Sequence, residues 1–188
     1  RAGLPVRTIV GTSMGAVVGA MYLAYRSSDR IMSLWREALE RELIPVITPM
    51  RQPLADGAKE HPLLQIARRI RNRVVVSFTM NRATVFDDDD IRAALEYLLP
   101  ETTLEELDGR LVCIATDLET GAEVRLERGC LREVVRASSA IPGLLPAVEI
   151  DGRPLVDGGV VAEVPVLTAR TVGWPVVAVD VAMDLPPL

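Results

Sequence analysis

The chain has 188 residues, of which 49% are hydrophobic and 25% charged, and its formal net charge is −5 at pH 7. This length suits one compact α/β domain, so we expect residues 1–188 to form a single domain. The negative charge argues against a nucleic-acid partner. Two cysteines are too few for a disulfide framework, and Cys113 lies in an apolar, strand-like run, which favours a reducing compartment.

No signal peptide or membrane span is evident. The longest uncharged run, residues 8–25, contains glycines that divide it, and it is typical of a strand, a turn and a helix rather than a span. We therefore expect a cytoplasmic or peripheral membrane protein. The chain starts at Arg1 and stops soon after a predicted strand, so we expect the domain to be incomplete at both ends. The oligomeric state has no signature in the sequence.

The first predicted elements are a strand over residues 8–10 and an uncharged helix over residues 14–25, which we expect to be buried. Between them lies the motif Gly11-Thr12-Ser13-Met14-Gly15. A G-x-S-x-G turn between a strand and a helix can expose a strained serine, and we expect glycine on both sides because a Cβ would clash there. The alternative is a glycine-rich turn with Ser13 as the helix N-cap.

Next, Asp29 is predicted to cap a helix that ends near Glu42, and residues 44–61 form a long proline-rich loop. Pro62 begins a further helix with one apolar and one basic face. The basic face either meets anionic lipid headgroups or is simply solvated. In the helix that ends near Glu42, the apolar face comprises Ile31, Leu34, Trp35, Ala38 and Leu39. In the helix that begins at Pro62, the basic face comprises Arg68, Arg69, Arg71 and Arg73.

Four aspartates, Asp87 to Asp90, precede a helix over residues 91–99. They could attract a metal ion, but acidic residues also stabilise a helix N-terminus and the spacing is not that of a calcium loop, so we expect no metal and no cofactor. Beyond them the predicted elements are a capped turn (102–107), strands (111–116, 123–126), a helix (131–137), a hairpin (148–150, 153–156), a helix (165–172) and a buried strand (174–181).

Strands that alternate with helices predict the α/β class, with a mainly parallel central sheet flanked by helices in three layers. Open α/β sheets place their chemistry at strand ends. A serine at such an end needs a base. The one histidine, His61, lies in the proline-rich loop, where the order Ser-His-Asp would be unusual. Of four Asp-Gly pairs, at Asp56, Asp108, Asp151 and Asp157, only the last continues as Asp157-Gly158-Gly159 at a strand end.

These motifs, in this order, resemble those of the patatin-like phospholipase family. The resemblance covers nearly the whole chain and extends beyond the serine and aspartate motifs. The further matching stretches are Ala115-Thr116-Asp117-Leu118, Thr120-Gly121, Arg136-Ala137-Ser138-Ser139-Ala140-Ile141-Pro142 and Val177-Ala178-Val179-Asp180.

The resemblance implies a Ser–Asp dyad that cleaves lipid acyl esters without a histidine, with Ser13 as nucleophile and Asp157 as base. The Met14 amide would supply one oxyanion donor, and the family's glycine-rich oxyanion loop would lie upstream of Arg1, so we expect residues 1–188 alone to be nearly inactive. Glu163 stands where the family often has asparagine. The implied partner is a lipid ester, with contact to a membrane surface. Acyltransferase or thioesterase chemistry, and a catalytically silent lipid-binding module, remain alternatives.

Overall fold

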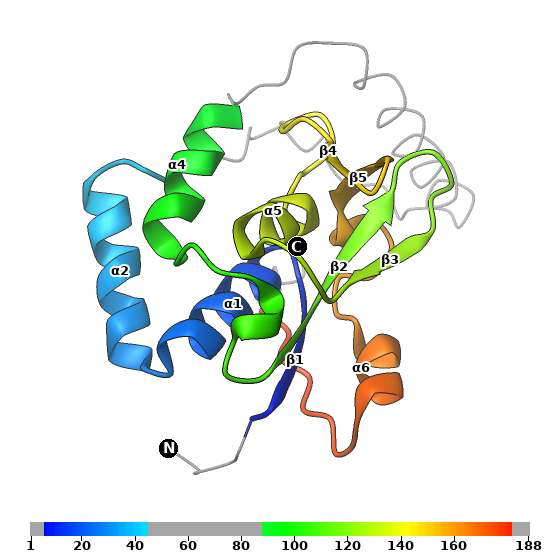
Figure 1. Ribbon diagram of the computed structural model, residues 1–188, viewed down its shortest axis with the longest axis horizontal. Helices are drawn as coiled ribbons and strands as arrows, with labels where there is room; N and C mark the ends of the chain where they lie inside the picture. The colour runs from blue at the N-terminus through cyan, green and yellow to red at the C-terminus, as the bar shows by residue number, and fades with distance from the viewer. Residues whose placement is uncertain (1–5, 45–87, 182–188) are drawn as a thin grey trace, which may run out of the picture.

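A computed structural model describes residues 6–44 and 88–181 (Figure 1). Within these ranges five strands form one sheet, and helices cover it. The strands are β1 (Thr8–Thr12), β2 (Arg110–Asp117), β3 (Glu123–Leu126), β4 (Val148–Ile150) and β5 (Arg153–Asp157). The helices are α1 (Met14–Tyr25), α2 (Ser28–Glu40), α4 (Asp88–Leu98), α5 (Leu131–Ser138) and α6 (Val166–Val172), with short 3-10 turns η1 (Leu104–Glu106) and η2 (Gly158–Val160).

The sheet is mixed and centred on β2, which is buried along almost its whole length. β1 runs parallel to β2, as the crossover through α1, α2 and α4 allows. β3 and β5 run antiparallel to β2, and β4 forms a hairpin with β5. Asp151 and Gly152 make the tight turn of that hairpin, both at positive φ. The predicted α/β class, a sheet flanked by helices, is confirmed, whereas the sheet predicted to be mainly parallel is mixed, with one parallel and three antiparallel pairs among the described strands.

The register places β1 and β5 on the same edge of β2. β3 and β5 both pair with Ala115 and Thr116, so they must lie on opposite edges of β2. β1 and β3 both pair with Cys113 and Ile114, so they also lie on opposite edges. β1 and β5 therefore follow one another along one edge and run towards each other, and their carboxyl ends meet there.

All the described helices except α6 form two layers on one side of the sheet. α1 and α5 pack directly on the strands, and α2 and α4 pack outside them (Figure 1). α6 contacts β1 from the side opposite α1. The core between these layers contains fully buried side chains from every layer. The largest are Met21, Leu23, Leu99, Leu111, Leu131 and Leu155.

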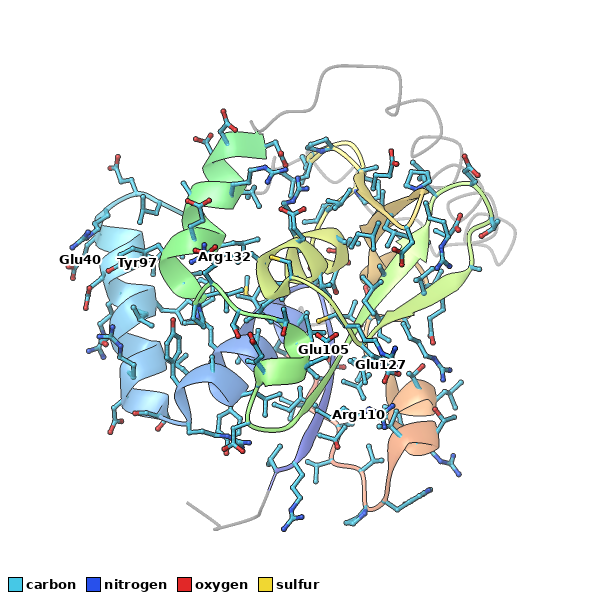
Figure 2. The ribbon with its side chains drawn as sticks, viewed as in Figure 1. Glu40, Tyr97, Glu105, Arg110, Glu127 and Arg132 are labelled. Atoms are coloured by element: carbon cyan, nitrogen blue, oxygen red, sulfur yellow. The ribbon has the colours of Figure 1, made fainter. Side chains whose placement is uncertain are left out.

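Polar contacts at the rim join α5 to α4 and β2 to the segment after β3 (Figure 2). Arg132 in α5 donates to the carbonyl of Leu99 just after α4, at 2.8 Å. Arg110 at the start of β2 pairs with Glu127 after β3, at 2.6 Å. Arg136 is only 11% exposed and pairs with Asp88 and Glu133, which ties α5 to the beginning of α4. α5 is thus tied to both ends of α4.

Most predicted elements agree with the structure, but details of two differ. The cap of α2 is Ser27, whose hydroxyl accepts from the Arg30 amide, whereas Asp29 lies in the first turn. A serine at the position before the helix competes well for the cap because its side chain reaches the free amides of the first turn. Leu39, predicted on the buried face, is 53% exposed near the end of the helix. In α1, Met14, Gly15 and Val18 are exposed, so the helix is not buried all round.

The predicted buried strand over residues 174–181 is wrong. These residues form no strand, and the side chains of Trp174, Val177, Val179 and Val181 are at least 71% exposed. Their β-branched pattern favours extended backbone, but a strand also needs a neighbour for its N–H and C=O groups. Within the described ranges, no strand offers this segment such pairing.

Candidate active site

Ser13 is the single residue between β1 and α1, and its backbone is strained. It has φ 54° and ψ −121°, a conformation that costs a residue other than glycine about 1–3 kcal/mol. Gly11 makes the turn sterically feasible, because a Cβ there would lie 2.5 Å from the Gly15 carbonyl oxygen and 2.7 Å from the Ala16 nitrogen. A Cβ on Gly15 would meet no described atom within 4 Å. The predicted need for glycine on both sides of the serine therefore holds for Gly11 only.

The remaining elbow residues anchor this turn. Thr12 is buried, and its hydroxyl donates to the Ala162 carbonyl oxygen at 2.9 Å, which ties the elbow to the segment after β5. The Ser13 carbonyl accepts from the amides of Ala16 and Val17. The N–H groups of Met14 and Gly15 therefore precede the hydrogen-bond ladder of α1, at the positive end of its dipole. An anion that formed beside Ser13 would face these amides.

Asp157 ends β5, and its backbone groups and one carboxyl oxygen are engaged. Its amide donates to the Ala140 carbonyl at 2.9 Å, and its own carbonyl accepts from the Thr116 hydroxyl at 2.9 Å. Its Oδ1 accepts from the Gly159 amide at 2.6 Å. The carboxyl group is therefore fixed in direction, with Oδ2 left for another partner.

That partner is the hydroxyl of Ser13. Ser13 Oγ donates to Asp157 Oδ2 at 2.5 Å, across 144 residues of sequence. The sheet explains the contact, since Thr12 pairs with Ile114 and Asp157 pairs with the next residue, Ala115. The carboxyl ends of β1 and β5 thus bring the side chains of Ser13 and Asp157 to one point.

Burial sets the proton affinity of this carboxyl group. Asp157 is 5% exposed, and desolvation raises its pKa above the ordinary value of 3.8. The hydrogen bonds from Ser13 and Gly159 act in the opposite direction and offset this rise only in part. A carboxylate with a raised pKa is a stronger base towards the hydroxyl it contacts.

Two further groups at the site have no signal of their own in the sequence. Ser138 and Ala140, at the end of α5, contact the backbones of Ser13 and Asp157 respectively. Both lie in the stretch over residues 136–142 that resembles the family, but nothing local assigns them this role, because only the tertiary fold brings α5 to the meeting point of β1 and β5.

Several predicted residues lie outside the described residues, namely His61, Asp87 and the basic face Arg68, Arg69, Arg71 and Arg73. Asp88, Asp89 and Asp90 form the first turn of α4, where Asp88 pairs with Arg92 and Arg136. Over residues 6–44 and 88–181, no group of three or more histidine, cysteine, aspartate or glutamate side chains could hold a metal ion. In the same ranges no helix has the length and apolar character needed to cross a membrane.

Fold and site together define an α/β protein with a serine on a strained strand-to-helix turn and a buried aspartate beside it. Residues 1–170 match the model of the patatin-like phospholipase family, and the chain belongs to that family.

Its relatives include an uncharacterized NTE family protein of Mycobacterium tuberculosis, 28% identical over 164 residues, which are 87% of this chain and 37% of the relative. The human patatin-like phospholipase domain-containing protein 6 is 27% identical over 183 residues, 96% of this chain and 11% of that protein. Lysophospholipase NTE1 of Candida glabrata is 26% identical over 182 residues, 95% of this chain and 9% of that protein. The chain thus spans little more than a third of the mycobacterial relative and less of the others.

Proposed function

We propose that this chain hydrolyses acyl esters of lipids through an acyl-enzyme on Ser13, with Asp157 as the base. The observation that carries the proposal is the hydrogen bond from Ser13 Oγ to Asp157 Oδ2 at a strained, partly exposed turn. Membership of the patatin-like phospholipase family, and relatives named as phospholipase or lysophospholipase, support lipid esters as the substrate class.

The chemistry takes two steps on one face of the elbow. Asp157 accepts the hydroxyl proton while Ser13 Oγ attacks the ester carbonyl carbon, and the alcohol leaves with a proton returned from the carboxyl group. Asp157 then deprotonates a water molecule, which attacks the acyl-enzyme; the fatty acid is released as Ser13 Oγ leaves and takes that proton back from the carboxyl group. The amide of Met14, at the N-terminus of α1, supplies an oxyanion donor in both steps.

The hydrogen bonds of the Asp157 carboxyl group support its role as the base. Oδ1 is held by the Gly159 amide, so Oδ2 is the oxygen available to the serine proton. The proton affinity raised by burial favours transfer, and the carboxyl group needs no histidine as intermediary.

Active-site labelling tests the proposal, with the protein as its gene encodes it. A fluorophosphonate probe should modify Ser13, and digestion with mass spectrometry should locate the adduct. Ser13→Ala should abolish labelling and ester hydrolysis, and Asp157→Asn should reduce both by about 10²–10⁴-fold, the usual contribution of a general base.

Asp151→Asn is the matched control, since Asp151 belongs to the same hairpin and also precedes a glycine, but lies exposed in the turn. It should leave both readouts unchanged. An unlabelled Ser13 with retained liposome binding would contradict the proposal and favour a catalytically silent lipid-binding module. Acyl transfer to glycerol or a lysolipid in place of fatty acid release would instead assign the acyl-enzyme to a transferase.

A further inference from the structure

Ser138 is the last residue of α5, fully buried, and it contacts the nucleophile turn through both of its oxygens. The Ser13 amide donates to the Ser138 carbonyl oxygen at 3.1 Å and to its hydroxyl oxygen at 3.2 Å. The Ser138 hydroxyl in turn donates to the Ile114 carbonyl oxygen at 2.6 Å. One hydroxyl therefore links the nucleophile's backbone to the central strand.

The Ser138 hydroxyl binds β2 at the point where the ends of β1 and β5 meet. Ile114 pairs with Thr12, the residue before the nucleophile, and its neighbour Ala115 pairs with Asp157. Two residues after Ser138, the Ala140 carbonyl accepts from the Asp157 amide. The end of α5 thus spans the gap between the ends of β1 and β5.

This contact matters because the Ser13 backbone is strained. A residue at φ 54° keeps that conformation only where its surroundings hold it, and relaxation towards negative φ would swing Oγ away from Asp157 Oδ2. The amide that fixes the φ rotation of Ser13 is the group that Ser138 binds. A loss of alignment of about 1 Å is enough to slow an enzyme strongly.

We propose that Ser138 is a positioning residue for the nucleophile, acting through the Ser13 backbone. The inference rests on the function proposed above, with Ser13 as nucleophile. The hydroxyl of Ser138 is not a catalytic group, because its proton is committed to Ile114 and its lone pair to the Ser13 amide. The bond also occupies the amide of Ser13 itself, so the oxyanion donors begin at Met14.

The neighbouring Ser139 offers a matched control. It is also at the end of α5, and its buried Oγ has no hydrogen-bond partner among the described residues. Ser138→Ala and Ser139→Ala therefore remove the same atom one residue apart, and only the first breaks contacts. Ser138→Thr keeps the hydroxyl and serves as the conservative rescue. If Ser138→Ala is not recovered folded, Ser138→Cys replaces the hydroxyl with a weaker acceptor at nearly the same volume.

The test measures fluorophosphonate labelling rate per titrated active site, together with kcat, KM and the pH profile on a short-chain nitrophenyl ester. Ser138→Ala should lower the labelling rate and kcat by about tenfold, the effect of one lost hydrogen bond on the barrier. KM and the pH midpoint should not move, because neither substrate contacts nor Asp157 are altered. Ser139→Ala should stay within about twofold of the unmodified protein, since it breaks no bond, and Ser138→Thr should recover most of the rate.

The outcomes separate this inference from the proposed function. An unmodified protein that fails to label at Ser13 overturns the proposed function. If the unmodified protein labels and Ser138→Ala labels at the same rate per site, only the positioning role is overturned, even where the melting temperature falls. An equal loss in Ser139→Ala, or a shifted pH midpoint in Ser138→Ala, overturns it as well, because the effect then does not come from the Ser138–Ser13 bond.

Discussion

The Cα of Gly158 packs against the carbonyl group of Ile114, so closely that a Cβ at position 158 would overlap the carbonyl oxygen and lie 2.6 Å from its carbon. Both residues belong to well-anchored parts of the chain, Ile114 to the middle of β2 and Gly158 to the turn that follows β5. The close approach seats Asp157 against the central strand, with its carboxyl group directed towards Ser13. The first glycine after the aspartate is thus a steric requirement of the site.

Gly158→Ala should therefore displace the turn after β5 and separate Asp157 from Ser13. We expect a destabilisation of about 1–3 kcal/mol, typical of overpacking, together with a large loss of esterase activity. Thermal unfolding followed by circular dichroism measures the first effect, and kcat measures the second. Gly173→Ala is the control, since a Cβ there meets no described atom within 4 Å. A fully active Gly158→Ala protein would show that the contact with Ile114 does not position the carboxyl group.

The pH dependence of activity should follow the ionisation of Asp157. The proposed mechanism requires a deprotonated Asp157, so kcat/KM should fall as the pH decreases through the pKa of this carboxyl group. Because burial raises that pKa above 3.8, the midpoint of the acid limb should lie above 3.8. A pH–rate profile on a neutral ester, with enzyme stability checked at each pH, provides the measurement. A midpoint at or below the ordinary aspartate value would assign the limb to another group.

The same shift predicts that Asp157 lowers stability at neutral pH. Its folded-state pKa lies above the unfolded value, so the stabilisation from protonating Asp157 is fully present below the unfolded pKa and is lost as the pH rises through the folded pKa. Asp157→Asn should therefore unfold at a higher temperature than the unmodified protein at pH 7, and the difference should shrink as the pH is lowered. Calorimetry at several pH values tests this. A variant that is less stable at pH 7 would indicate that its hydrogen bonds outweigh the desolvation of the carboxylate.

The two cysteines should differ in reactivity. Cys113 is fully buried in β2, and desolvation raises its pKa to about 12, whereas Cys130 is exposed before α5. A thiol reagent at pH 8 should modify Cys130 in the native protein and reach Cys113 only when the sheet opens. Peptide mapping of native and denatured samples distinguishes the two. Modification of Cys113 at the rate of Cys130 would mean that β2 is accessible in the native state.

Local sequence signals predict much of this fold and the two central site residues, because their causes are local. The strand of residues 123–126 and the uncharged helix of residues 14–25 have the predicted bounds, since turn residues and charge pattern define their ends. Residues 174–181 show the limit of this reasoning. Their pattern is that of a strand, but strand formation depends on a neighbour that no local pattern specifies.

The site was predictable as a pair of motifs and not as a geometry. Ser13 and Asp157 each have a recognisable neighbourhood in the sequence, whereas Ser138 has none, because its role arises only where α5 meets the gap between β1 and β5. Similarly, the G-x-S-x-G motif predicts the same steric requirement at both of its glycines. An added Cβ would clash with other described backbone atoms only at Gly11.

This asymmetry between the glycines leads to a direct comparison of Gly11→Ala with Gly15→Ala. A Cβ on Gly11 would collide with the backbone of Gly15 and Ala16, so Gly11→Ala should push α1 away from β1, lower the melting temperature and abolish labelling of Ser13. Gly15 lies in the first turn of α1 with open space around its Cα in the described structure, and alanine is favoured over glycine in helices by up to about 1 kcal/mol. Gly15→Ala should therefore unfold at the same temperature as the unmodified protein or higher. Equal destabilisation by the two variants would mean that the second glycine also faces a close neighbour, and the elbow would then be tighter than its described contacts indicate.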